Sequence, residues 1–283
     1  MGVHPVIETP LVVVEEIASA MGDGRKPLLE LALAAAHGVS ARDLGGVIVA
    51  TFSGPERFPA LSVRIASALG LPAATPAFDL QMACSAYPYA LYLAGRLSSD
   101  TGKRILVIDG DVQSRLVNPD DRATGRIFSD AVTASVVSSE RDSAEKSCFA
   151  FYSKASEALH CPSEGPISMD GMKVFTFVAT EVRAFLKAFL ADVPALSAEK
   201  APPFFFVPHQ ANPYMVRQLA KSLGLEKALV TLDPALLNPG SCSIPLALAQ
   251  SGKTGTALAA GFGAGYSAAA AVVRVAANAR PCG

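Results

Sequence analysis

Three side chains with complementary chemistry lie far apart in the sequence: Cys84, His209 and Asn238. A thiol can act as a nucleophile, whereas an imidazole and a carboxamide can donate hydrogen bonds to the oxygen of an enolate or of a tetrahedral intermediate. Each residue alone has an ordinary explanation, because most buried cysteines are inert, a histidine is often satisfied at a strand end, and Asn-Pro-Gly is a common turn sequence. Their combination indicates an active site with a thiol nucleophile and two neutral donors for a negatively charged oxygen.

The stretch from residue 77 to residue 97 predicts a short strand, a tight turn at Cys84 and a helix that is apolar on nearly every side. Pro88 falls in the first helical turn, where its missing N–H removes no helical hydrogen bond. Between Tyr89 and Leu97 the one charged residue is Arg96, so we expect the helix to be buried. Cys84 would then lie at a helix N-terminus, whose dipole favours a thiolate and a developing oxyanion.

His209 and Asn238 also lie where functional groups are expected. His209 directly follows a strand of bulky apolar residues, 204–207, and the ends of strands in α/β sheets commonly carry functional side chains. The glycine-rich segment 261–265 could bring backbone N–H groups close to a ligand, or it could be a simple hairpin turn. No helix and downstream acid follow it, so it does not predict a dinucleotide site.

The composition narrows the class of protein. The chain has 283 residues, 51% of them hydrophobic and 17% charged, with a formal net charge of -1, so nucleic acid and anionic membranes are not expected partners. No P-loop, HExxH or EF-hand pattern is present, so we expect no metal. The odd number of cysteines and the lack of CxxC spacing indicate neither a disulfide framework nor a zinc site: Cys84, Cys148, Cys161, Cys242 and Cys282. The first residues do not resemble a signal peptide, and we expect a cytoplasmic location. Three other histidines give no functional signal: His4, His37 and His160.

The pattern of apolar runs predicts alternating helices and strands. We expect strands over residues 46–52, 104–110, 131–138, 149–153, 204–207 and 228–232, and helices over residues 27–36, 60–69, 174–190, 214–223 and 244–250. Residues 1–25 are poorly patterned, apart from residues 11–17, which could begin a strand or a helix. The uncharged segment 254–273 is glycine-rich and predicts two buried strands with a glycine turn rather than a membrane span.

This alternation predicts an α/β fold with mainly parallel, buried sheets. The polar stretch at residues 139–147 divides the chain into two parts of similar size: residues 1–145, which carry Cys84, and residues 146–283, which carry His209 and Asn238. The similar sizes suggest a duplicated fold, although the letters show no repeat.

From about residue 27 onwards the chain resembles the β-ketoacyl-acyl-carrier-protein synthase III family of the thiolase-like superfamily. Three motifs occur in the order of that family: Ala83-Cys84-Ser85-Ala86 before a buried helix, Val207-Pro208-His209-Gln210-Ala211-Asn212, and Asn238 six residues before Ile244-Pro245. Supporting matches lie at residues 111–112, 118–122, 128–130 and 261–266.

The resemblance implies a five-layered α-β-α-β-α fold built from two similar thiolase-like halves, usually in a homodimer. It implies that Cys84 takes an acyl group from a thioester, that His209 and Asn238 bind the malonyl thioester carbonyl, and that the backbone N–H groups of Cys84 and Ala264 form the oxyanion hole. No cofactor is implied, and acyl-CoA or acyl-carrier-protein thioesters are the substrates. The product would be a 3-oxoacyl thioester in fatty acid or polyketide-like secondary metabolism.

The resemblance also assigns residues around this centre. Phe58 matches an aromatic residue that reaches across the dimer to close the partner's acyl pocket, and Tyr87 is expected beside that pocket. The family's basic residue after the HQAN motif is replaced by Tyr214, so docking of the acyl carrier protein would rely on Arg217 or Lys221.

Three departures indicate a divergent member of the family. We expect the family's first strand and the segment with an adenine-stacking Trp to be shortened or missing, and the chain contains no Trp. A carrier-protein donor is therefore more plausible than CoA. The glycine-rich GDGAGA loop of the family is replaced by residues 129–134, which read SDAVTA.

Three other functions compete with condensation. The acyl group on Cys84 could pass to water, an alcohol or an amine. The order Cys, His, Asn also occurs in papain-like peptidases, although the CGSCW-type context is missing. A non-catalytic subunit of a heterodimeric ketosynthase is the third alternative, and it gives no physical reason for keeping all three residues.

Overall fold

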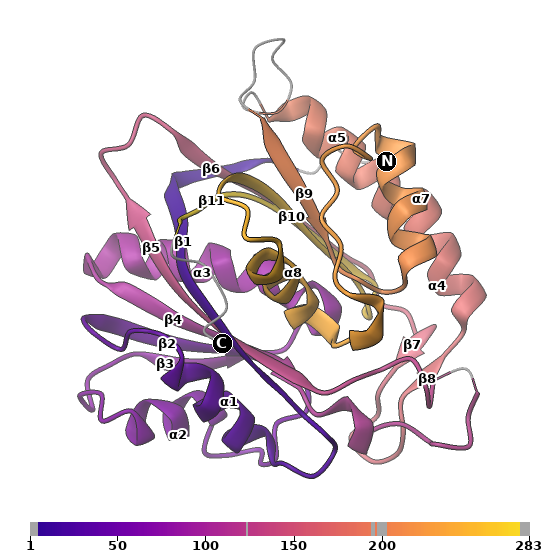
Figure 1. Ribbon diagram of the computed structural model, residues 1–283, viewed down its shortest axis with the longest axis horizontal. Helices are drawn as coiled ribbons and strands as arrows, with labels where there is room; N and C mark the ends of the chain where they lie inside the picture. Colours follow the sequence, from indigo (N-terminus) through magenta and orange to yellow (C-terminus); the bar gives the residue numbers. More distant parts are fainter. Residues whose placement is uncertain (1–4, 123, 194–195, 197–202, 278–283) are drawn as a thin grey trace.

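Nine strands form one large sheet in the described part of the chain (Figure 1). The structure is a computed structural model that describes residues 5–122, 124–193, 196 and 203–277. The strand order in this sheet is β3-β2-β4-β5-β1-β6-β11-β10-β9. The strands are β1 (Ile7–Met21), β2 (Leu44–Ala50), β3 (Ala77–Leu80), β4 (Arg104–Asp111), β5 (Ala131–Glu140), β6 (Lys146–Ser153), β9 (Phe204–Pro208), β10 (Gly255–Gly263) and β11 (Ser267–Val275). The short strands β7 (Leu159–His160) and β8 (Ser168–Met169) pair separately.

The helices pack as layers on the two halves of this sheet. Helices α1 (Leu28–His37) and α2 (Leu61–Ala68) cover the outer face of the half formed by β2 to β5, and α4 (Gly171–Phe177), α5 (Arg183–Asp192) and α7 (Pro213–Leu223) cover the outer face of the other half. Between the halves lie α3 (Ala86–Thr101) and α8 (Ser243–Ser251), whose side chains share one apolar cluster with both sets of strands. Two outer helical layers, two half-sheets and a central helical layer give the predicted five-layered α/β fold.

Most of the expected elements are present. The predicted buried helix after Cys84 is α3, and the uncharged segment 254–273 forms the antiparallel pair β10 and β11, as expected. The predicted helical run 174–190 is α4 and α5, joined by a π-helical turn, Val178–Val182. His4 and Cys282 lie outside the described residues.

Two expectations about the strands are wrong. The sheet is mixed rather than mainly parallel: β2–β3, β2–β4, β1–β11 and β9–β10 are parallel, whereas β1–β5, β1–β6, β4–β5, β6–β11 and β10–β11 are antiparallel. Residues 228–232 do not form a strand, because they make only an isolated bridge between Leu229 and Phe206. A run of apolar residues predicts burial, and burial does not fix the direction of pairing.

The N-terminal segment forms strand β1, which lies between β5 and β6 and pairs with both. The sequence pattern left a strand and a helix open over residues 11–17, and the structure has a strand there. The register of β1 shifts between Val14 and Glu16, which is a β-bulge.

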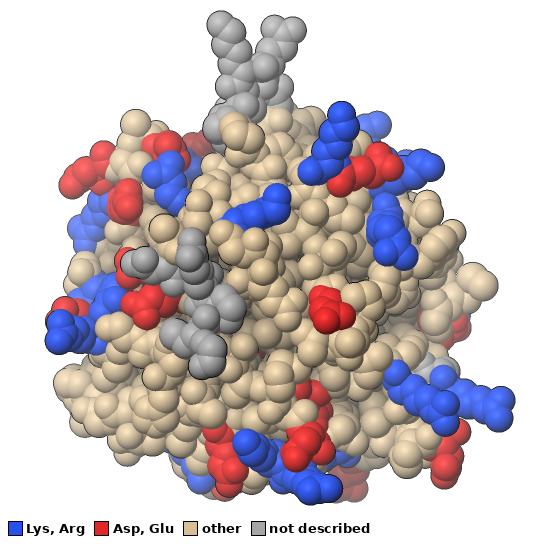
Figure 2. All heavy atoms as spheres, in the orientation of Figure 1, with Lys and Arg blue, Asp and Glu red and all other residues tan. Residues whose placement is uncertain are grey.

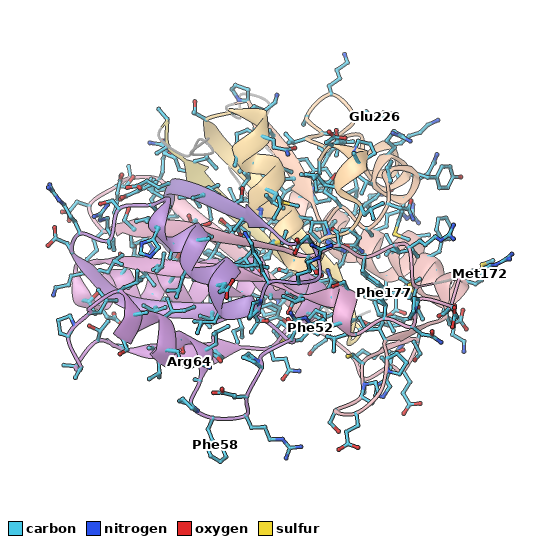
Figure 3. All side chains as sticks on the ribbon, turned by 60° about the horizontal axis from the view of Figure 1, so that its bottom comes forward. Phe52, Phe58, Arg64, Met172, Phe177 and Glu226 are labelled. Atoms are coloured by element: carbon cyan, nitrogen blue, oxygen red, sulfur yellow. The ribbon has the colours of Figure 1, made fainter. Side chains whose placement is uncertain are left out.

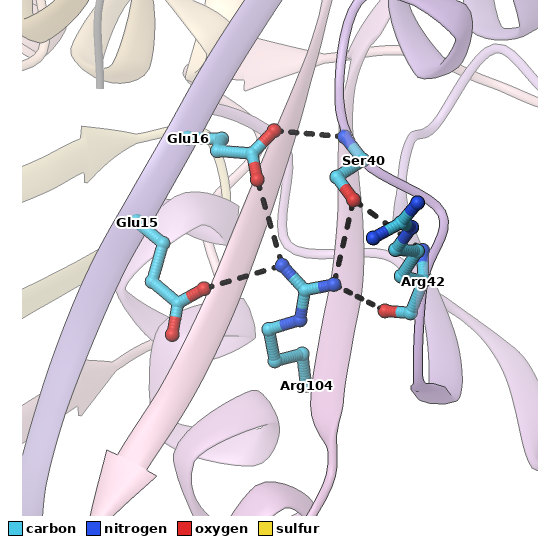
Figure 4. A network of polar contacts seen from close by, with 5 residues as sticks. All are labelled: Glu15, Glu16, Ser40, Arg42 and Arg104. Atoms are coloured by element: carbon cyan, nitrogen blue, oxygen red, sulfur yellow. Dashed lines mark hydrogen bonds and ion pairs between the residues drawn. The ribbon is translucent and has the colours of Figure 1, made fainter. Parts of the chain in front are cut away.

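A polar network connects this bulge to strand β4 and to the loop after α1 (Figure 4). Arg104, at the start of β4, lies 3.5 Å from carboxylate oxygens of Glu15 and of Glu16. Glu16 also accepts a hydrogen bond from the Ser40 N–H at 2.8 Å, and Arg104 donates to the carbonyl of Arg42. The network therefore holds β1, β4 and the loop after α1 together.

Charged side chains of both signs are mixed around the face shown in Figure 2, and no large patch of one sign is visible there. Among the described helices, none has both the length and the apolar character needed to cross a membrane.

Candidate active site

Cys84 lies in a 3-10 turn, Ala83–Ser85, between strand β3 and helix α3. Ala83 has a φ of 42°, which is an unfavourable conformation for a residue with a side chain. This sharp turn places Cys84 at the start of the buried helix, as the sequence predicts. The side chain is only 6% exposed.

Strand β10 passes very close to this turn because it carries glycines. A Cβ at Gly263 would lie 2.8 Å from the Cys84 Cβ and 3.0 Å from its Sγ. A Cβ at Gly261 would lie 2.7 Å from the Ser85 Cα. The glycine segment is therefore part of a strand that must approach the thiol closely, followed by the turn into β11.

The thiol of Cys84 is protonated at neutral pH. Burial raises its pKa to about 11, and the charges of Asp111 and Asp109 act in the same direction. Backbone hydrogen bonds from Ala264 and from Cys84 itself lower the pKa, but they do not offset the burial. Burial therefore outweighs these hydrogen bonds, because removal from water disfavours the charged form of the thiol.

The same two backbone N–H groups were expected to form the oxyanion hole. In the structure the backbone N–H groups of Ala264 and Cys84 donate hydrogen bonds to the Cys84 sulfur, and these bonds lower the pKa of the thiol. Preorganised donors at a reacting centre stabilise negative charge that develops there.

His209 follows β9 directly and is 2% exposed. Its backbone N–H donates to the Ala260 carbonyl at 2.7 Å, and its Nδ1 lies 2.9 Å from the Ser243 Oγ. Burial lowers the pKa of the ring to about 4, although a hydrogen bond with the Gly240 backbone opposes this shift. The imidazole is therefore neutral at physiological pH and carries one N–H.

Asn238 is held by hydrogen bonds on its backbone and on one end of its side chain. Its N–H donates to the Ile127 carbonyl at 3.0 Å, and its carbonyl accepts from the Ser129 N–H at 3.1 Å. The side-chain Oδ1 accepts from the Gly240 N–H at 3.0 Å. Because the oxygen is used in this way, the NH₂ end of the amide remains as a donor.

The three predicted residues line one cavity. Cys84, His209 and Asn238 all contribute to a narrow space of about 150 Å³, together with Phe262 and Gly263. Cys84 also lines a larger cavity of about 740 Å³ on another side, where Ala264 forms part of the wall. The sulfur therefore lies between two spaces, of which only the narrow one contains the imidazole and the carboxamide.

Two residues near the site carry roles that sequence reasoning missed. Ser243 contacts the His209 ring, with its Oγ 2.9 Å from Nδ1, and this Oγ also accepts a hydrogen bond from the Gln210 N–H at 3.1 Å. Asp111 accepts hydrogen bonds from the hydroxyl of Thr51 at 2.6 Å and from the N–H groups of residues 52 and 53 at 2.9 and 3.0 Å. Asp111 thus holds the loop after β2 against the large cavity. The sequence match at residues 111–112 was a signal for Asp111, whereas nothing in the sequence indicated Ser243.

The remaining predicted residues are not among those that line the two cavities beside Cys84. Phe58 is 85% exposed and projects from its loop away from the body of the chain (Figure 3). Phe52, by contrast, lies against the body of the chain. Tyr87 is fully buried in the core, where its hydroxyl lies 3.0 Å from the Ser135 Oγ, and it does not contribute to the walls of the two cavities beside Cys84. Arg217 and Lys221 are exposed on α7.

Comparisons with known proteins identify the family of this chain. The family model for 3-oxoacyl-[acyl-carrier-protein] synthase III matches residues 78–155, and the model for the C-terminal part of that enzyme matches residues 204–275. A β-ketoacyl-[acyl-carrier-protein] synthase III of Shewanella oneidensis is 32% identical over 257 residues, which are 84% of this chain and 79% of that protein. The chain belongs to the 3-oxoacyl-[acyl-carrier-protein] synthase III family.

Solved structures support the same assignment. The synthase III of Pseudomonas aeruginosa superposes with a TM-score of 0.84 at 26% identity, over 94% of this chain and 98% of the other. A 3-oxoacyl-(acyl-carrier protein) synthase of Burkholderia xenovorans has the same fold, with a TM-score of 0.88 at 22% identity and 99% coverage of both chains. Membership of this family removes the peptidase alternative. Among the described residues, no group of His, Cys, Asp and Glu is arranged to hold a metal ion.

Proposed function

We propose that this synthase III family member forms a carbon–carbon bond between an acyl group on Cys84 and a malonyl thioester. The observation that carries the proposal is the single narrow cavity lined by Cys84, His209 and Asn238. A sulfur nucleophile and two neutral hydrogen-bond donors around one cavity suit the decarboxylating condensation that gives a 3-oxoacyl thioester.

In the first half-reaction, the Cys84 sulfur attacks the carbonyl carbon of an acyl thioester. The N–H groups of Cys84 and Ala264 stabilise the oxyanion that forms, because both already point at the sulfur. The carrier thiol leaves and the acyl group remains on Cys84. The proton of the Cys84 thiol ends on the departing sulfur, so this step produces no net charge in the buried site.

In the second half-reaction, the malonyl thioester occupies the narrow cavity. His209 and the NH₂ group of Asn238 donate hydrogen bonds to the thioester carbonyl oxygen. Loss of CO₂ leaves the electron pair as an enolate on that oxygen, and the two donors stabilise its charge. The enolate carbon then attacks the acyl carbonyl, the carbon–sulfur bond to Cys84 breaks, and the sulfur regains a proton.

The partners follow from the same proposal. An acyl carrier protein would present the malonyl group, and the exposed cations Arg217 and Lys221 on α7 are available to its acidic surface. A homodimer would bury the exposed ring of Phe58 and place it beside the acyl pocket of the partner subunit. The reaction needs no cofactor, and a cytoplasmic location suits its substrates.

The proposal is tested by measuring CO₂ release from malonyl-acyl-carrier-protein in the presence of an acyl thioester. We expect CO₂ and a 3-oxoacyl thioester in equal amounts, with Cys84→Ala losing both. Release of free acid, ester or amide without CO₂ would contradict condensation and would indicate simple acyl transfer. Full activity of Cys84→Ala would contradict the role of the thiol.

A further inference from the structure

Gln113 is a buried amide in the wall of the large cavity beside Cys84. It lies in a 3-10 turn, Gln113–Arg115, directly after β4, and is 1% exposed. Phe128 and Leu116, which also line the cavity, are apolar, and the polar side chains of Gln81, Lys154 and His160 are exposed. Gln113 is therefore a buried amide in a wall whose other side-chain amide, Gln81, is exposed to solvent.

The orientation of the Gln113 amide is fixed by its partners. Its Nε2 donates to the Ser129 carbonyl at 3.0 Å and to the Asn238 carbonyl at 3.1 Å. Both partners are backbone oxygens, which can only accept, so the NH₂ end must point at them. The two hydrogens of this group are then used, and Oε1 is the end that remains.

Oε1 has no hydrogen-bond partner among the described residues. It is nevertheless not sealed from the cavity, because the sealed and unpaired side-chain oxygens in the described chain belong to Ser62, Asp109 and Ser139. Oε1 is thus a hydrogen-bond acceptor with a fixed orientation at the surface of the cavity. Rotation of the side-chain amide would break both hydrogen bonds of Nε2.

The large cavity is the side on which the acyl chain must lie. The narrow cavity holds His209 and Asn238 and measures about 150 Å³, whereas the large one measures about 740 Å³ and contains neither residue. The malonyl carbonyl needs the two donors, so the chain bound to Cys84 extends into the other space. This step rests on the proposed function.

We propose that Gln113 selects acyl groups that carry a hydrogen-bond donor, such as a hydroxyl. An acyl chain displaces water from the cavity, and a purely aliphatic chain leaves Oε1 without a partner. A buried acceptor without a partner disfavours binding, whereas a hydroxyl on the chain restores the hydrogen bond. The preferred substrates are therefore hydroxyacyl thioesters, and Gln113 in the cavity wall determines this preference.

The test measures acylation of Cys84 by intact-protein mass spectrometry, with thioesters of N-acetylcysteamine as the acyl donors. Two matched pairs are compared: butyryl with 3-hydroxybutyryl, and hexanoyl with 6-hydroxyhexanoyl. In at least one pair we expect the hydroxylated acyl group to react about five- to tenfold faster, which corresponds to one net hydrogen bond. In Gln113→Leu that preference should disappear or reverse.

The acylation rate is the chosen readout because Gln113→Leu also removes the two hydrogen bonds that hold residues 129 and 238, which condensation needs. Gln81→Leu is the control, because it makes the same substitution at an exposed position of the cavity wall. In this variant the acylation rate with the hydroxylated thioester, divided by the rate with the unsubstituted thioester, should equal the wild-type value. Equal or faster reaction of the plain acyl group in both pairs, or an unchanged ratio in Gln113→Leu, would overturn the inference. Failure of every thioester to acylate Cys84, or acylation without CO₂ release from malonyl thioesters, would instead overturn the proposed function.

Discussion

At the scale of single residues, burial decides the protonation states of the reacting groups. It keeps the Cys84 thiol protonated, with a pKa of about 11, and the His209 ring neutral, with a pKa of about 4. The types of these residues predicted a nucleophile with two oxyanion donors, and the family resemblance added the prediction of a thioester intermediate. Their protonation states were not predictable, because the desolvation of each group depends on neighbours that are distant in the sequence.

The pKa of Cys84 predicts how its alkylation depends on pH. Because the thiolate is the reactive form, the rate with iodoacetamide should rise about tenfold for each pH unit between pH 7 and pH 10. Peptide mapping measures this rate separately for Cys84 and for the exposed Cys161. A plateau in the Cys84 rate below pH 9 would show that the helix dipole outweighs burial after all.

Asn238 should affect only the second half-reaction. In Asn238→Asp the Oδ1 that accepts from Gly240 is kept and the NH₂ donors are lost. We expect CO₂ release to fall about 10²- to 10³-fold, as when an oxyanion donor is removed, with the acylation rate of Cys84 nearly unchanged. A mass-spectrometric acylation assay and a CO₂ assay on the same sample separate the two effects. Equal losses in both would mean that Asn238 serves the structure of the site rather than the enolate.

At the scale of elements, the site depends on the close approach of β10 to the turn before α3. The buried strands and helices were largely predictable, because continuous apolar runs such as those of β4 and β10 indicate burial. For β1 the sequence left a strand and a helix open over residues 11–17, because the bulge between Val14 and Glu16 interrupts the alternation of side chains. At residues 228–232 a strand was predicted that does not form, because this apolar run makes only an isolated bridge at Leu229.

Gly263→Ala should disable the site by contact alone. Its Cβ would lie 2.8 Å from the Cβ of Cys84, so the thiol must move. A shift of about 1 Å at a reacting group costs about 100-fold in rate, and we expect a loss of at least that size in Cys84 acylation. Gly224→Ala is the matched control, because Gly224 also has a positive φ but no atom lies within 4 Å of its Cβ position. The control should lose stability in thermal unfolding while keeping the acylation rate per folded molecule. Normal acylation in Gly263→Ala would contradict the packing argument.

At the scale of the whole molecule, the two half-sheets bring together residues more than a hundred positions apart. The five layers were predictable through the resemblance, whereas contacts such as the one between Gln113 and the Asn238 carbonyl arise only when β4 and the turn before α8 meet. The spacing of apolar residues in the sequence does not predict such a contact. The exposed ring of Phe58 is a feature of the same scale, because a second copy of the chain is what would cover it.

Sedimentation tests that expectation. We expect the wild-type chain to sediment at twice its mass of 29.3 kDa, and Phe58→Asp to weaken the dimer by at least about tenfold, as for a buried aromatic anchor. Tyr214→Asp replaces another exposed aromatic residue, on α7, and should leave the dimer intact. A monomeric wild-type chain, or a dimer that is indifferent to Phe58→Asp, would contradict this role.

The central claim is that one buried sulfur accepts an acyl group and releases it only into a new carbon–carbon bond. A single-turnover experiment measures this most directly: the isolated acyl-enzyme is mixed with malonyl-acyl-carrier-protein, and the mass on Cys84 is followed together with CO₂. We predict one CO₂ and one 3-oxoacyl thioester for each acyl group lost from Cys84. Loss of the acyl group without CO₂, or CO₂ release while the acyl group stays on Cys84, would contradict the claim.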